Sequence, residues 1–99
     1  KTEKHYQAII YLTFSLLGYY IQSEVKSAVG RADAVCRTKD RIYVFEFKVD
    51  GSAEDALRQI DDKGYLIPYK AEDGMELVKV GVNISTQTRT VDSWKVEVE

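Results

Sequence analysis

Apolar and polar positions recur along the chain with two periods, and they predict one helix and three strands in its first half. Residues 4–20 carry apolar side chains at intervals of three and four, which predicts a helix with one broad apolar face. Three extended stretches follow, separated by turn signals at Gly30 and at Lys39-Asp40: residues 21–29, 31–38 and 41–50. Strands joined by such short turns form an antiparallel meander.

The second half of the chain is predicted to contain a helix and two more strands. Ser52 is a good N-cap for a helix over residues 53–63. Gly64 and Pro68 interrupt that helix, so residues 65–71 form a short turn or a kinked continuation. Beyond it the pattern predicts, in order, a buried strand, a polar loop and a half-exposed last strand over residues 75–85, 86–91 and 94–99.

The order of these elements predicts an α/β fold, with one domain over residues 1–99. A strand–helix–strand unit implies a parallel pair of strands with a right-handed crossover. The simplest arrangement is therefore a mixed sheet of about five strands, flanked by helices on its two faces.

Composition and charge limit the class of protein, the ligands and the cellular compartment that are expected for this domain. The 99 residues are 44% hydrophobic and 30% charged, as in ordinary globular chains, and the net charge of −2 argues against a stand-alone, tight nucleic-acid binder. Cys36 is the only cysteine and His5 the only histidine, which excludes cysteine-based zinc sites and predicts a reducing, cytoplasmic setting. No apolar run approaches the roughly 20 residues of a membrane span. The chain begins at Lys1 rather than methionine, which predicts a domain cut from a longer protein.

The stretch 41–50 contains the candidate chemistry. Glu46 and Lys48 lie inside an otherwise apolar strand, two positions apart and therefore on the same face. Burying charges is costly unless they are paired or bind an ion. The preceding strand carries Asp33, and two neighbouring carboxylates repel each other unless a cation lies between them. Carboxylates suit Mg²⁺, and a lysine beside the metal can stabilise a phosphoryl transition state, so this set predicts metal-dependent phosphodiester hydrolysis.

Three motifs resemble a known family when they are taken in this order: Gly30-Arg31-Ala32-Asp33, Phe45-Glu46-Phe47-Lys48, and Gln59-Ile60 on the following helix. They look like the PD-(D/E)XK nuclease superfamily, whose restriction-endonuclease-like core has the order α-β-β-β-α-β-β. Further segments look like a domain at the C-terminal end of bacterial AAA-ATPase-like proteins: Phe45 to Asp50, Gln59 to Tyr69 and Val80 to Trp94. Alanine rather than proline precedes Asp33, which departs from the family's pattern.

The resemblance implies a role for each motif residue. Asp33 and Glu46 would be ligands of Mg²⁺ or Mn²⁺, with the backbone carbonyl of Phe47 as a third ligand. Lys48 would act on the attacking water or the transition state, and Gln59 would orient the site from the second helix. The implied partners are nucleic acid, DNA before RNA, and an N-terminal ATPase-like domain of the same parent chain.

Simpler interpretations of the charged residues stand beside this one. Glu46 and Lys48 could form a structural salt bridge on a covered sheet. Asp33 could pair with Arg31 or Arg37, each two or more positions along the same strand.

Two further features bear on the function. Glu24 on the first strand could approach the second strand across the hairpin and add a metal ligand, whereas Gln59 could be an ordinary solvated position. Residues 54–73 contain six acids against three bases and would repel nucleic acid if they faced the cleft. Three classes of function therefore stay open: a nuclease domain tethered to an ATPase, an inactive nuclease-fold module that binds DNA or protein, and a structural interaction domain.

Overall fold

The computed structural model describes the backbone of residues 20–27, 30–70 and 72–99, and the side chains from Asp33 onward apart from residue 71. The helix predicted over residues 4–20 lies outside the described residues, except that Tyr20 begins the first strand. Within the described part of the chain, no helix is long and apolar enough to cross a membrane.

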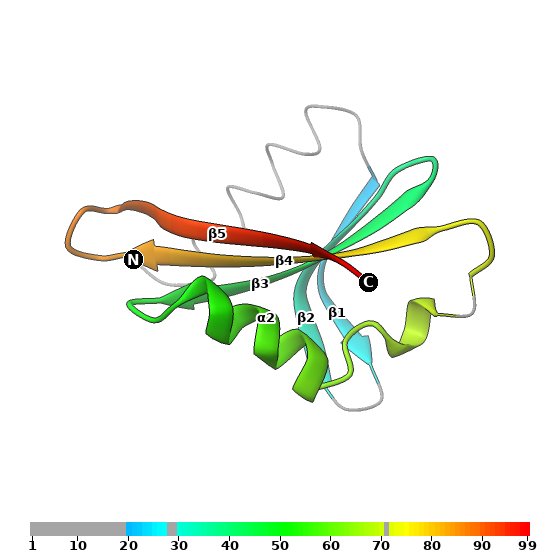
Figure 1. Ribbon diagram of the computed structural model, residues 1–99, viewed down its shortest axis with the longest axis horizontal. Helices are drawn as coiled ribbons and strands as arrows, with labels where there is room; N and C mark the ends of the chain where they lie inside the picture. Colours follow the sequence, from blue (N-terminus) through cyan, green and yellow to red (C-terminus); the bar gives the residue numbers. More distant parts are fainter. Residues whose placement is uncertain (1–19, 28–29, 71) are drawn as a thin grey trace.

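The described chain forms one mixed sheet with a helix against it (Figure 1). The strands lie in the order β1-β2-β3-β4-β5, and every neighbouring pair is antiparallel except the parallel pair of β3 and β4, which α2 connects. The mixed α/β architecture and the parallel pair joined by a helix confirm the prediction from the element order. In sequence the elements are β1 Tyr20–Ser27, β2 Gly30–Arg37, β3 Arg41–Val49, α2 Ala53–Asp62, the 3₁₀ turn η1 Ile67–Tyr69, β4 Glu76–Ser85 and β5 Thr90–Val98.

The last strand differs from its prediction in both length and exposure. The polar loop expected over residues 86–91 is a four-residue turn over 86–89, so β5 begins at Thr90 rather than at Trp94. Trp94 is 67% exposed, and Val96 and Val98 are more than half exposed, so the strand is not half-buried. It is an edge strand of the sheet, and among the described strands it pairs with β4 alone.

The sheet has two differently packed faces because side chains alternate along each strand. On the face that α2 covers, Val35, Ile42, Val44 and Leu77 pack with apolar residues of α2 and with both tyrosines that follow it. The opposite face holds a second apolar cluster. Its buried members are Ala34, Cys36, Phe45, Phe47, Val78, Val80, Val82 and Ile84. Cys36 is therefore a free thiol buried in this cluster.

Local signals in the sequence set both ends of α2. The Oγ of Ser52 accepts a hydrogen bond from the N–H of Asp55 at 3.0 Å, which caps the start of the helix as predicted. At the other end Gly64 has a φ of 65°, and the N–H of Tyr65 donates to the carbonyl of Ile60 at 3.1 Å. This glycine-terminated C-cap reverses the chain, so that residues after the helix return to its buried side.

A glycine brings α2 close to the sheet. A Cβ on Gly81 of β4 would lie 2.4 Å from the carbonyl oxygen of Ala53 and 3.1 Å from side-chain atoms of Ala56 and Leu57. Only a residue without a side chain fits there. Since Gly81 is paired with Glu46 of β3, this close approach occurs beside the charged end of β3.

Candidate functional site

The central strand β3 presents Glu46 and Lys48 on the face that α2 covers. Alternate residues point to this face, and the first two, Ile42 and Val44, are fully buried in the core beneath α2. The next two are charged. Glu46 is only 3% exposed, its Oε1 is completely buried, and Lys48 is half-buried. The face is therefore apolar where β3 begins and charged where it ends.

The side-chain amide of Gln59 connects these two charges. Its Nε2 donates to Oε2 of Glu46 at 2.5 Å, while its Oε1 accepts a hydrogen bond from Nζ of Lys48. Gln59 is half-buried on α2, so it is not an ordinary solvated helix position. An amide suits this place because it offers a donor to the carboxylate and an acceptor to the ammonium.

Asp33 reaches the site from β2, at the point where β2 and β3 stop pairing through their backbones. The last pair in their ladder joins Ala34 to Phe45, so the same register brings Asp33 opposite Glu46. Opposed residues of an antiparallel pair point to the same face. The Oδ2 of Asp33 also accepts the backbone N–H of Phe47 at 2.8 Å, replacing a bond that the ladder would otherwise make. The carboxylates of Asp33 and Glu46 therefore lie on the same face of the sheet, at the place where the ladder between β2 and β3 ends.

The backbone of Phe47 is oriented toward the same place. In an extended strand the N–H and C=O of one residue point to the same side. Because the N–H of Phe47 points to Asp33, its carbonyl oxygen also faces the β2 side, where a metal ligand would have to lie. The role of this carbonyl stays a prediction.

Glu24, the further ligand considered, is placed only by its backbone. It lies between Ser23, paired with Ala34, and Val25, paired with Ala32. This register brings Glu24 opposite Asp33 on the neighbouring strand. Its side chain lies outside the part of the chain that the structure describes.

The structure adds Tyr65, which none of the sequence motifs indicated as a site residue. Tyr65 is 6% exposed, and its hydroxyl lies 3.4 Å from Nε2 of Gln59. Burial is the largest effect and raises the pKa of the Tyr65 phenol; the hydrogen bond with Gln59 lowers it by less, and the negative charges of Glu46 and Asp33 raise it slightly further. The phenol therefore stays protonated near neutral pH. The sequence feature that could have placed Tyr65 at the site is Gly64. A glycine at the end of a helix turns the chain so that the next residue packs back against that helix.

The donors at this site fit a divalent cation that prefers oxygen. Mg²⁺ is commonly held by one or two carboxylates and keeps several waters, and Asp33 and Glu46 supply two carboxylates. In residues 33–70 and 72–99, no group of three or more His, Cys, Asp or Glu side chains gathers to hold an ion. Oxygen donors alone favour Mg²⁺ or Mn²⁺ over zinc.

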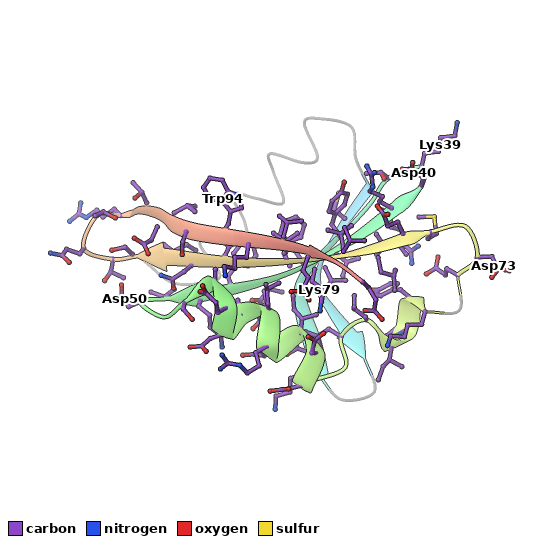
Figure 2. All side chains as sticks on the ribbon, viewed as in Figure 1. Lys39, Asp40, Asp50, Asp73, Lys79 and Trp94 are labelled. Atoms are coloured by element: carbon purple, nitrogen blue, oxygen red, sulfur yellow. The ribbon has the colours of Figure 1, made fainter. Side chains whose placement is uncertain are left out.

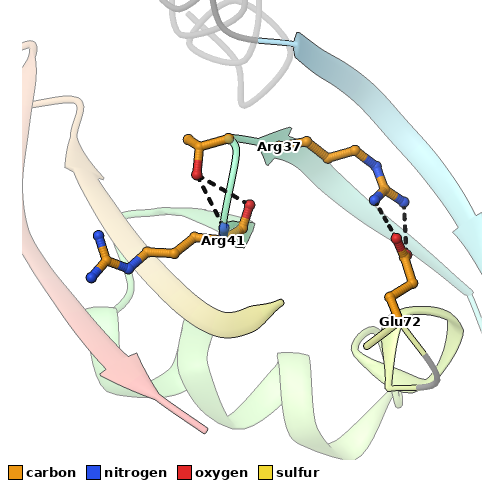
Figure 3. Close-up of polar contacts among 4 residues, drawn as sticks. Arg37, Arg41 and Glu72 are labelled. Carbon is orange, nitrogen blue, oxygen red and sulfur yellow. Dashed lines mark hydrogen bonds and ion pairs between the residues drawn. The ribbon is translucent and has the colours of Figure 1, made fainter. Parts of the chain in front are cut away.

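Of the two arginines considered as partners of Asp33, Arg37 is engaged at the other end of its strand. Its two terminal nitrogens donate to Glu72 at 2.6 and 2.9 Å, as Figure 3 shows, and its guanidinium lies 5.3 Å from the centre of the Tyr69 ring. The side chain of Arg31 lies outside the described residues.

The fold and these residues define a class: an α/β domain with paired carboxylates, a lysine and a glutamine where a central strand meets a helix. The family described as the PD-(D/E)XK nuclease superfamily matches residues 1–94, and the chain belongs to that superfamily. This confirms the superfamily that the motifs resemble.

A protein of Azotobacter chroococcum mcd 1, named "Uncharacterized protein in vnfD 5'region", is 35% identical over 97 residues. The similarity covers 96% of this chain and 19% of that protein, so the chain spans about a fifth of its relative's length. The narrower likeness to a domain of AAA-ATPase-like proteins stays a prediction.

Proposed function

We propose that the chain is a metal-dependent nuclease domain that hydrolyses phosphodiester bonds of nucleic acid. One observation carries the proposal: Gln59 hydrogen-bonds both Glu46 and Lys48 at the place where Asp33 enters from the neighbouring strand. A salt bridge that only stabilised the sheet would need neither the glutamine nor the second carboxylate. Membership of the nuclease superfamily supports the same conclusion.

Each side chain has a distinct task in this proposal. A bound Mg²⁺ or Mn²⁺ would polarise the phosphate and lower the pKa of a water. Asp33 and Glu46 would hold the ion, and the hydrogen bond from Gln59 fixes the direction of the Glu46 carboxylate. The ammonium of Lys48 has three donors, of which Gln59 takes one, so the others can orient the attacking water or meet charge on the phosphate.

Cleavage of nucleic acid tests the proposal directly. We expect the full chain with Mg²⁺ or Mn²⁺ to cut labelled single-stranded DNA, duplex DNA or RNA, and we expect Lys48→Ala to lower the rate by at least about a hundredfold. Cleavage by Lys48→Ala at the wild-type rate would assign the activity to a contaminant or to other residues. Binding of oligonucleotides without any cleavage would favour the inactive, binding-only alternative.

Metal binding gives a second test that does not depend on turnover. Addition of Mg²⁺ or Mn²⁺ should raise the melting temperature by an amount that grows with metal concentration, because the folded state alone holds the site. Asp33→Asn should remove this shift. The matched control is Asp73→Asn, an exposed acid in the turn before β4, which should keep it. An unchanged shift in Asp33→Asn would place the ion elsewhere.

We also propose that an ATPase-like domain of the same parent chain recruits or gates this domain. The similarity to AAA-ATPase-associated domains supports this, and the much greater length of the Azotobacter relative leaves room for such a domain.

A further inference from the structure

An open groove runs from the candidate site along the outer side of α2. Its volume is about 390 Å³, and it is lined by Lys48, Asp55, Arg58, Gln59, Asp62 and Lys63. Lys48 and Gln59 belong to the site itself. The other four lie on the helix and its C-cap at spacings of three, four and one, so they form one continuous strip that leads away from Lys48.

The lining of this groove selects for a charged ligand. All six lining side chains are polar or charged, so there is no aromatic surface on which a base could stack. Three of them are cations and two are carboxylates, which makes the strip formally positive in a chain whose net charge is −2.

The cations of the groove are available to a ligand. Arg58 pairs with Asp55 at 2.7 Å, but both side chains are more than half exposed, so this pair contributes little and can exchange its partner. Lys63 forms no ion pair with any residue whose side chain the structure describes. Both cations can therefore meet an anion without breaking a strong contact.

Acids outside the groove are neutralised by other parts of the fold. Three of the six acids between residues 54 and 73 pair with bases from the strands: Glu54 with Lys95 at 3.0 Å, Asp61 with Lys79 at 3.0 Å and Glu72 with Arg37 at 2.6 Å. These three pairs therefore reduce the repulsion that the acid-rich sequence of this segment would exert on nucleic acid in the groove.

From these observations we propose that the groove is the path of a nucleic-acid backbone adjacent to the bond that is cut, with Arg58 and Lys63 contacting its phosphates. This inference rests on the proposed nuclease function and adds how the substrate is held. The volume is in the range of about 300–1,000 Å³ that small ligands occupy, which suits a short stretch of one strand. Contacts to phosphates do not distinguish one base from another, so binding in the groove is independent of the base sequence of the nucleic acid.

The test measures binding without metal, so that no cleavage occurs. Fluorescence anisotropy of labelled single-stranded DNA and RNA is recorded with the full chain in EDTA at several salt concentrations. Arg58→Ala/Lys63→Ala should bind both about tenfold more weakly, and its salt slope should fall by about 1.4, or 0.7 for each lost phosphate contact. Asp62→Asn, which removes an acid from the groove, should bind more tightly than wild type.

The matched control is Lys39→Ala/Arg89→Ala, which removes the same two charges from exposed turns. Lys39 lies in the turn between β2 and β3 and Arg89 in the turn between β4 and β5, and neither lines the groove. In Figure 2 Lys39 lies at the end of the molecule opposite to Asp50, which follows the charged end of β3. This variant should bind like wild type, because the total charge alone does not set the affinity.

The outcomes separate the groove from the nuclease activity. Equal binding by the groove variant and the control variant, or no oligonucleotide binding by wild type, would overturn the groove. Loss of binding in the groove variant alone supports it even if Mg²⁺ brings no cleavage, in which case the proposed nuclease function fails by itself. Unequal affinities for DNA and RNA would identify which of the two backbones the groove holds.

Discussion

Gln59 determines how the two charges of β3 are held. Its amide stands between a carboxylate that is 3% exposed and a lysine that is half-buried, so neither charge depends on the other alone. If Lys48 is replaced by methionine, Glu46 still accepts from Gln59. We therefore expect Lys48→Met and Glu46→Gln each to change the free energy of unfolding by less than about 1 kcal/mol, while both abolish cleavage.

Denaturant melts of the two single variants and the double variant measure this. Arg41→Met is the control on the same strand, because Arg41 forms an exposed pair with Glu76 at 2.7 Å and should keep both stability and activity. Two strongly destabilised single variants that are partly rescued in the double variant would show that the charges hold the sheet together. The catalytic assignment would then be withdrawn.

Lys79 of β4 is a buried lysine whose charge is paired with two exposed carboxylates. Its side chain is 8% exposed, and its Nζ pairs with Asp61 at 3.0 Å and with Glu97 at 2.7 Å, both more than half exposed. Figure 2 shows it between the sheet and the end of α2. Burial lowers the pKa of Lys79, but its hydrogen bonds to Glu97 and Asp61 raise it more, so the net pKa is raised and the lysine is charged near neutral pH.

The two sides of this cluster should respond unequally to mutation. Asp61→Asn/Glu97→Gln leaves a buried ammonium without a counter-charge and should cost about 3 kcal/mol. Lys79→Met leaves two carboxylates that water can solvate and should cost less than about 1 kcal/mol. Melts at pH 7 compare the two variants, and a larger loss for Lys79→Met would contradict the prediction.

The sequence predicted which residues lie at the site better than it predicted the hydrogen bonds that join them. The alternation along β3 was enough to put Glu46 and Lys48 on one face, and the hairpin was enough to bring Asp33 near them. The bridging of both charges by Gln59 was not predictable, because it depends on how closely α2 approaches the sheet. The hydroxyl of Tyr65 was missed because a tyrosine near a helix usually indicates packing.

At the scale of elements, Gly81 sets the distance between α2 and the sheet. A methyl group there would meet the Ala53 backbone oxygen at 2.4 Å, and a backbone cannot rotate away as a side chain can. We expect Gly81→Ala to lower the free energy of unfolding by about 1–3 kcal/mol. Because Gln59 moves with α2, cleavage should fall more than the folded fraction does.

Gly74→Ala is the control for this prediction. Nothing lies within 4 Å of the Cβ that it would add, so its cost comes only from its φ of +76° and should be about 1 kcal/mol. Its cleavage rate should follow the folded fraction. Wild-type stability and activity in Gly81→Ala would mean that α2 can shift without cost, and the site would then not depend on this contact.

Elements with strong local signals were predicted with ends accurate to one or two residues. β3 and α2 have a turn and a cap that sequence shows directly, and their observed ends differ from the prediction by one residue. β5 was predicted to begin four residues too late because the polar residues at its start pair with β4 through their backbones, for instance Ser93 with Asn83. Backbone pairing leaves no hydrophobic pattern in the sequence.

At the scale of the whole molecule, ion pairs join segments that are distant in sequence. Arg37 of β2 meets Glu72, which lies 35 positions later, just before the turn that leads into β4. Glu54 of α2 similarly meets Lys95 of β5. These contacts neutralise two of the acids between residues 54 and 73, and they make the stability of the fold depend on the ionisation of those carboxyl groups.

Because of the ion pair between Arg37 and Glu72, the stability of the folded protein should decrease at acid pH. The hydrogen bond from Arg37 lowers the pKa of Glu72 below its ordinary value of 4.5 in the folded state. A carboxyl group with a lowered folded pKa stabilises the protein above its unfolded pKa and loses that contribution as the pH falls through its folded pKa. Glu72→Gln should therefore be less stable than wild type at pH 7, and the difference should shrink as the pH falls below 4.5 and through the folded pKa of Glu72.

Denaturant melts between pH 7 and pH 3 measure this difference. Arg37→Gln is the informative second variant, because it removes the same pH-dependent part together with the contact to the Tyr69 ring, which does not depend on pH. Its difference from wild type should shrink with acid but not disappear. A difference between wild type and Glu72→Gln that stays constant from pH 7 to pH 3 would show that this pair, although its nitrogen and oxygen lie 2.6 Å apart, contributes no pH-dependent stability.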